Sequence, residues 1–418
     1  MTRPPRWLGQ VLVLVLAVAV AAPAKAGPLE DGQKALDARA WADAADAFRR
    51  VLEKDPKNAD AAVGLAQAVI EGGFTDAIPG AEESLQQALE AKPKDHALRL
   101  ALGRLYLAKA ASNAADPTIM KFTLADAQTT FRALLDENGA DEDAVAGLAR
   151  ALYDSALFDQ ALEVLDGFLA EHPSSNGKAP FWQGQVLYLQ AQDAYRAAGK
   201  LDGKTRDLFE KARKAYAAAA AADPRHFDAW MQLGYATQYL GQDLAAAQAA
   251  YEKAMDLDPQ SSLPLKGIAA LYTYSRPKQY GPALQALVKA HPKNAQAWWF
   301  LAHERLGAKD GAQALEAFEA FQALSVTPQA AWTWMAKAWE VEGDDAKAET
   351  LYVKALKANP DDAVAADALD RRVRAARMEE AGKSPAGAKK LVETYEPLFA
   401  MAPNNAAIRN NAAFILPE

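Results

Sequence analysis

The 418-residue chain contains no cysteine. Disulfide bonds, thiol catalysis, thiolate metal ligands and lipid attachment through a cysteine are therefore excluded. Histidine is also scarce, with five residues, and only His303 falls inside a predicted first helix rather than near a turn. The sequence has no His-Glu-x-x-His zinc pattern, no Gly-x-Ser-x-Gly elbow and no Gly-x-x-x-x-Gly-Lys phosphate loop. We therefore expect neither enzymatic activity nor a bound metal or cofactor.

No apolar stretch reaches the roughly 20 residues that a membrane-spanning helix needs. The longest run, Val11–Ala22, follows Arg3 and Arg6 and precedes a small-residue cleavage pattern that ends at Ala26. This order is typical of a secretory signal peptide. An uncleaved anchor is the alternative, but the run is short for one. We predict that residues 1–26 are a signal peptide, and hence a periplasmic or secreted protein without a transmembrane span after cleavage.

The chain has fewer basic than acidic residues, 46 against 54, and its formal net charge is -8. An acidic surface gives no support for nucleic-acid binding or for binding to anionic lipid. Linkers rich in glycine, serine or proline are also missing. We therefore expect residues 27–418 to form one continuous array rather than separate domains.

Four segments of the chain share one spacing. A small residue is followed after four positions by an aromatic residue or leucine, after three more by alanine and after five more by proline. The segments are Ala81–Pro93, Ala212–Pro224, Ala247–Pro259 and Ala348–Pro360. The small residue and the ring lie on one helix face, where a neighbouring helix approaches closely, and the proline ends the helix. Residues that follow prolines are expected to cap the next helices, namely Asn58 after Pro56, Asn294 after Pro292, Asp361 after Pro360 and Asn404 after Pro403.

This pattern resembles the second helix of a tetratricopeptide repeat. The resemblance implies an all-α fold, a right-handed superhelical solenoid of stacked antiparallel helix pairs. Repeat ends fall at Pro56, Pro93, near Asn138, and at Pro173, Pro224, Pro259, Pro292, Pro328, Pro360 and Pro403, which gives about ten repeats. Insertions are expected near residues 109–124, 190–206 and 382–387. They are either partner contacts or tolerated extra length.

The resemblance also implies which residues touch a ligand. In this family, fixed positions of each first helix face the concave groove and contact bound peptides. Carried over residue by residue, these positions are Met231, Tyr235, Gln238, Tyr239, Lys266, Tyr274, Trp299 and His303. An aromatic patch with a few polar groups has the composition of a binding hot spot. The alternative is that neighbouring repeats bury these rings.

One ligand of the family is not expected. Relatives that grip the acidic tail of heat-shock chaperones use a clamp of lysine and asparagine in the first repeat, where this chain has Leu29 and Gln33. Lys266 and Lys337 could each meet a single carboxylate.

We therefore expect a non-catalytic scaffold of the bacterial cell envelope that binds a peptide or a partner subunit in its groove and associates with an envelope complex. The alternative is a structural, self-assembling module that contacts its partners through the ends of the solenoid. An enzyme with its site in an insertion is a third, weaker interpretation. The sequence does not identify the partner.

Overall fold

The computed structural model describes residues 27–241, 243–275, 277–381, 393, 396–406 and 408–409, without the side chains of 274–275 and 373–381. The predicted signal peptide and the predicted insertion near 382–387 lie outside these residues. The chain forms two compact units, Met1–Glu171 and His172–Glu418. Each is described separately below.

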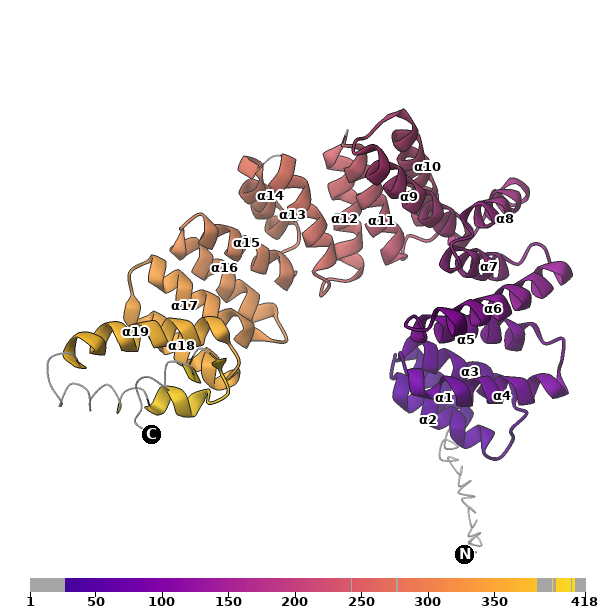
Figure 1. Ribbon diagram of the computed structural model, residues 1–418, viewed down its shortest axis with the longest axis horizontal. Coiled ribbons are helices and arrows are strands. Elements are labelled where there is room, and N and C mark those ends of the chain that lie inside the picture. Colours follow the sequence, from indigo (N-terminus) through magenta and orange to yellow (C-terminus); the bar gives the residue numbers. More distant parts are fainter. Residues whose placement is uncertain are drawn as a thin grey trace, which may run out of the picture. The chain divides into compact units, whose positions relative to one another are not determined.

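The first unit is built from α-helices and one short 3-10 helix (Figure 1). The α-helices are α1 (Pro28–Asp37), α2 (Trp41–Leu52), α3 (Ala59–Glu71), α4 (Ile78–Ala91), α5 (His96–Ser112), α6 (Pro117–Glu137), α7 (Glu142–Asp154) and α8 (Phe158–Glu171), and η1 spans Thr75–Ala77. Each odd-numbered helix packs against the even-numbered helix that follows it, and α1, α3, α5 and α7 also contact one another in sequence. The helix pairs therefore stack, with the first helices of the pairs forming one layer.

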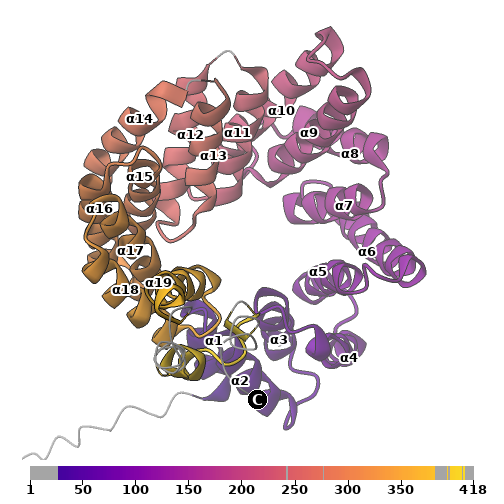
Figure 2. The same ribbon diagram turned by 60° about the vertical axis from the view of Figure 1, so that its left-hand side comes forward.

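The second unit repeats this plan over its described residues (Figure 2). Its helices are α9 (Lys178–Ala198), α10 (Gly203–Ala222), α11 (Phe227–Leu240), α12 (Leu244–Leu257), α13 (Leu263–Ser275), α14 (Pro277–Ala290), α15 (Ala295–Gly307), α16 (Gly311–Leu324), η2 (Pro328–Ala331), α17 (Trp332–Val341), α18 (Asp345–Ala358) and α19 (Ala363–Ala381). Contacts join α11 to α13, α13 to α15 and α15 to α17. The described part of the chain is thus an all-α solenoid, as the repeat spacing predicted.

The helices begin close to the capping residues that the sequence predicts. Asn58 and Asn294 accept hydrogen bonds from the backbone N–H groups of residues 61 and 297, at 3.0 and 2.9 Å, and so cap α3 and α15. The predicted caps at Asp361 and Asn404 are each wrong by one residue. The carboxylate of Asp362 accepts from the N–H groups of residues 364 and 365 instead, because α19 begins at Ala363 rather than directly after the proline. At the second position, Oδ1 of Asn405 accepts from the N–H group of residue 408.

Aromatic rings from the second helices fix the stacking of the first helices. The ring of Tyr251 is fully buried and lies against two glycines, where added Cβ atoms would come within 2.4 Å at Gly234 and 2.6 Å at Gly267. Gly234 belongs to α11 and Gly267 to α13, so one ring sets the approach of two successive first helices. Phe48 and Phe131 occupy equivalent places in the first unit. A larger residue at either glycine would displace the ring.

The extra residues near 109–124 and 190–206 lie mostly in lengthened helices. In the repeat that contains residues 109–124, α5 and α6 have 17 and 21 residues, compared with 13 and 14 in α3 and α4. In the repeat that contains residues 190–206, α9 and α10 have 21 and 20. The added length therefore extends the helix pair instead of forming a long irregular loop.

Candidate functional site

Three successive first helices of the second unit, α9, α11 and α13, border an open hollow of about 490 Å³. The hollow is lined by Tyr188, Gln192, Gln232, Tyr235, Gln238, Tyr239, Lys266, Gly267 and Ala270. Residues three, four or seven positions apart share one face of a helix, which explains why 232, 235 and 239 of α11 line it together. Four of the predicted groove residues, Tyr235, Gln238, Tyr239 and Lys266, are thus brought to one place. We call this the α11 hollow.

Aromatic contacts hold one wall of the α11 hollow in place. The ring of Tyr239 stacks on the buried Phe209 of α10, with centroids 4.7 Å apart and planes 11° from parallel. The rings of Tyr188 and Tyr195, both from α9, meet Tyr239 edge-on at 5.9 and 6.0 Å. Tyr239 nevertheless remains 41% exposed. It is a rigid ring with surface left for a ligand, which is the property expected of a hot-spot residue.

The polar groups of the α11 hollow are mostly uncharged. Burial raises the pKa of Tyr188, of Tyr235 and of the underlying Tyr251, so their hydroxyl groups keep their protons at physiological pH. The hydroxyl of Tyr251 donates a hydrogen bond of 2.7 Å to Oε1 of Gln238. Lys266 is the one lysine, arginine, aspartate or glutamate among the lining residues, and it is exposed.

Sequence reasoning missed Tyr188, Gln192 and Gln232 as part of this site. Tyr188 and Gln192 lie on the long helix α9, whose first-helix register is obscured by the extra residues of that repeat. Gln232 sits one residue outside the predicted groove positions of α11. The signal that could have found the first two is their own spacing of four residues, which places a ring and an amide on one face.

The prediction that Met231 faces the groove is wrong. Its side chain is only 3% exposed and belongs to the core cluster that contains Tyr251. The unbranched thioether side chain fills irregular core gaps well, which accounts for its burial at this position. Met231 is therefore a packing residue. Tyr274 lies on α13, and its side chain is outside the described residues.

Trp299 and His303 form a separate cluster on α15. The Trp299 ring lies 5.7 Å from Phe318 and 4.8 Å from Phe321, so it is partly buried against the core. The His303 ring lies 4.5 Å from Trp299 and 4.5 Å from Trp334. Neither residue lines the α11 hollow. The prediction placed them in the same groove, and the structure shows that packing occupies much of both rings.

Burial controls the charge of His303. Desolvation, with a smaller contribution from the positive charge of Lys337, lowers the pKa of His303 to about 4. The imidazole is therefore neutral at physiological pH. Its Nε2 atom is buried and has no hydrogen-bond partner among the described residues.

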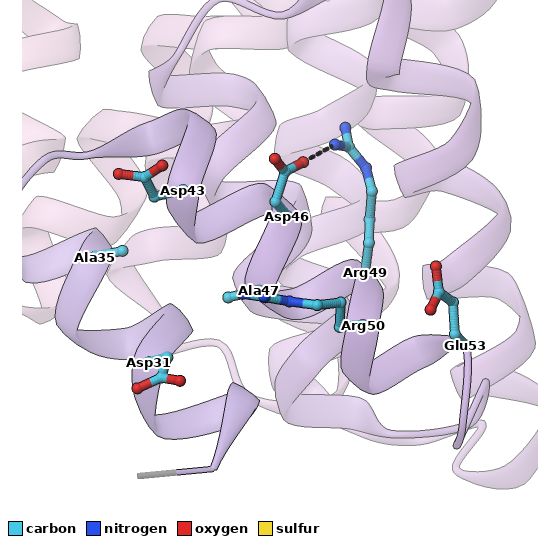
Figure 3. Close-up of a pocket in the computed structure, with 8 residues that line it drawn as sticks. All are labelled: Asp31, Ala35, Asp43, Asp46, Ala47, Arg49, Arg50 and Glu53. Carbon is cyan, nitrogen blue, oxygen red and sulfur yellow. Dashed lines mark hydrogen bonds and ion pairs between the residues drawn. The ribbon is translucent and has the colours of Figure 1, made fainter. Parts of the chain in front are cut away.

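A second hollow, of about 660 Å³, lies between α1 and α2 in the first unit (Figure 3). Asp31, Asp43, Asp46 and Glu53 contribute carboxylates around it, and Asp46 pairs with Arg49 at 2.7 Å. These five side chains are solvent-exposed. Carboxylates near a helix start and arginines near its end also stabilise the helix dipole. We interpret this hollow as a solvated charged surface rather than a binding site.

Among the described residues, no group of three or more histidine and carboxylate side chains is arranged to hold a metal ion. Within the same residues, no helix combines the length and the apolar character that crossing a membrane requires.

Two family models, both described as tetratricopeptide repeat, match the sequence. One covers residues 35–77 and the other covers residues 196–262 and 301–363. These matches fall on the helix pairs described above. The chain is a tetratricopeptide-repeat protein. Among curated proteins, none matches the sequence.

Solved structures similar to this tetratricopeptide-repeat protein have low sequence identity. A human IFIT1 dimer with m7Gppp-AAAA is 16% identical, with 79% of this chain and 70% of that chain covered and a TM-score of 0.44. A thermophilic TPR protein of Thermus thermophilus is 18% identical over 50% of this chain and 97% of its own, with a TM-score of 0.40. YrrB, a TPR protein with an unusual peptide-binding site, is 20% identical over 53% and 97%, with a TM-score of 0.30. The tetratricopeptide repeat is typically a non-catalytic module for protein interaction, and its presence supports the role of a protein-interaction scaffold for this chain.

Proposed function

We propose that this protein is a non-catalytic scaffold of the bacterial cell envelope that binds an extended peptide, or an extended segment of a partner subunit, in the α11 hollow. The observation that carries the proposal is the hollow itself. Three successive first helices bring Tyr235, Gln238, Tyr239 and Lys266 together around about 490 Å³ of space. The molecule bound in the α11 hollow is a partner protein of an envelope complex.

The mechanism is passive recognition by a surface that exists before the ligand arrives. Tyr239 is fixed by its stack on Phe209, and Gln238 is fixed by its hydrogen bond from Tyr251. Side chains that are already ordered lose little conformational freedom on binding. Rings supply buried apolar area, and amide groups supply hydrogen bonds to a peptide backbone. No covalent step is part of this function.

The envelope location rests on the sequence of residues 1–26, which lie outside the described structure. The expected outcome is a secreted or periplasmic protein whose mature N-terminus is Gly27. Cell fractionation and N-terminal sequencing of the purified protein test it. An N-terminus at Met1 or Thr2 in a cytoplasmic fraction would contradict the location while leaving groove binding untouched.

The groove is tested by capture with the double substitution Tyr235→Ala and Tyr239→Ala. Envelope extract is passed over the immobilised wild-type protein and over the double variant, and retained proteins are identified by mass spectrometry. We expect one partner to be retained by the wild type and lost by the variant. Phe122→Ala, which removes a ring that is 67% exposed in the first unit, is the matched control and should retain it. Circular dichroism must show that all three proteins are equally helical.

Two results would contradict the proposal. If the double variant retains the same partner as the wild type, the contact lies elsewhere on the solenoid. If no partner is retained and the purified protein grows in mass with concentration, measured by light scattering, the alternative of self-assembly through the solenoid ends is favoured.

A further inference from the structure

The charge of the α11 hollow differs from that of the chain as a whole. The chain has more acidic than basic residues, yet none of the nine lining residues is acidic and one, Lys266, is basic. Among the described residues, no ion pair involves Lys266. Its ammonium group is therefore a local positive charge with no carboxylate bound to it, on a protein whose surface otherwise favours negative charge.

The amide of Gln238 adds hydrogen-bond donors to this charge. Its Oε1 atom accepts the hydrogen bond from Tyr251, so the Nε2 atom and its two N–H groups are directed away from the buried tyrosine. Because Gln238 lines the hollow, those donors are available to a ligand oxygen. The neutral hydroxyl of Tyr235 on the same helix is a further donor, since burial raises its pKa. Gln238 and Tyr235 therefore both offer hydrogen-bond donors on this wall.

Small residues lie next to Lys266 on the wall that α13 contributes. Gly267 and Ala270, which both line the hollow, carry no side chain larger than a methyl group. A ligand side chain can thus lie beside Lys266 without displacing a protein side chain. Across the hollow, the exposed ring of Tyr239 offers an apolar surface.

We propose that the segment bound in the α11 hollow carries a single acidic side chain that pairs with Lys266, next to an apolar residue that packs on Tyr235 and Tyr239. Backbone carbonyl groups of the segment accept hydrogen bonds from Gln238. A single lysine selects one carboxylate rather than a polyanion, so the ligand is a peptide of mixed composition and not a nucleic acid. This inference rests on the proposed function, because it specifies the ligand of the same site.

A phage-displayed library of random 12-residue peptides tests the inference. The library is selected in parallel on the purified wild-type protein, on Lys266→Gln and on the double variant Tyr235→Ala and Tyr239→Ala. We expect wild-type selection to enrich peptides with one aspartate or glutamate beside an apolar residue. For a selected peptide, replacing that acid by its amide should weaken binding about 5- to 10-fold, a loss that high salt reduces. On Lys266→Gln the same replacement should have no effect.

Lys253→Gln is the matched control, because Lys253 is an exposed lysine on the second helix α12 and does not line the hollow. It should keep the preference for the acidic residue. Peptides that need the two tyrosines but bind equally well with acid or amide would overturn the inference and leave the proposed function standing. Peptides whose binding does not depend on the two tyrosines would overturn both. A single-stranded oligonucleotide that competes with the selected peptide at equal concentration would also overturn the inference.

Discussion

The Tyr251 hydroxyl donates a 2.7 Å hydrogen bond to Oε1 of Gln238. This contact joins a fully buried ring, which spaces α11 from α13, to a residue that lines the α11 hollow. The pair of Tyr251 and Gln238 therefore contributes both to the packing of the solenoid and to the shape of its candidate binding surface.

Tyr251→Phe should separate these two roles. The ring and its packing are retained, but the donor to Gln238 is lost, so the free energy of unfolding should fall by about 0.5 to 1.5 kcal/mol. Because the Gln238 amide is then free to rotate, peptide affinity should also fall. Urea denaturation and peptide titration measure the two effects. An unchanged affinity would show that the orientation of Gln238 does not matter for binding.

Gly234→Ala should destabilise the second unit. The added Cβ would lie 2.4 Å from the Tyr251 ring, so the ring or the helix must move, at a cost of about 1 to 3 kcal/mol. Gly167→Ala on α8 is the matched control, since no atom lies within 4 Å of its added Cβ. That change should stabilise the protein by about 0.5 to 1 kcal/mol, because alanine favours a helix. In urea denaturation, a lower free energy of unfolding for Gly234→Ala together with a higher one for Gly167→Ala confirms the close packing at Gly234. A change in the same direction for both variants contradicts it.

Ala247→Leu tests the small-residue position of the repeat. Ala247 is fully buried on α12 and belongs to the core cluster around Tyr251. A leucine there should overpack the contact between helices and cost about 1 to 3 kcal/mol of unfolding free energy. Ala249, two residues further along α12, is exposed, and Ala249→Leu serves as the comparison. A silent Ala247→Leu would mean that this helix interface is looser than the structure indicates.

Acid should destabilise the cluster around His303. Its pKa is lowered from 6.5 to about 4 in the folded protein. Above pH 6.5 the imidazole is neutral in the folded protein and in the unfolded chain, so it does not reduce the free energy of unfolding. As the pH falls from 6.5 towards 4, the unfolded chain takes up the proton first, so the folded state loses stability. An NMR titration of the His303 ring should give a midpoint near 4.

The His303→Gln variant isolates this contribution from general acid denaturation. Between pH 7 and pH 4.5 the wild type should lose more unfolding free energy than His303→Gln. An NMR midpoint near 6.5, or equal losses in the two proteins, would show that the ring is hydrated and that Trp299 and Trp334 do not shield it.

The sequence was sufficient to predict helix pairs, because proline, capping asparagine and the small-residue spacing act locally. Asn58 and Asn294 cap helices where expected. The candidate site was predicted in part. Tyr235, Gln238, Tyr239 and Lys266 meet around one hollow, but Met231 is buried, because the burial of a helix position depends on how the neighbouring helices pack against it. Tyr188 was missed because extra turns in α9 obscure its register.

Site-specific photocrosslinking shows where on the solenoid the partner is bound. A benzophenone amino acid is introduced at Tyr239, or at Leu257, which is 38% exposed at the end of the second helix α12, and the cells are irradiated. If the partner lies in the α11 hollow, position 239 gives a discrete adduct and position 257 gives none. An adduct from position 257 alone would place the partner on the outer layer and contradict binding in the α11 hollow.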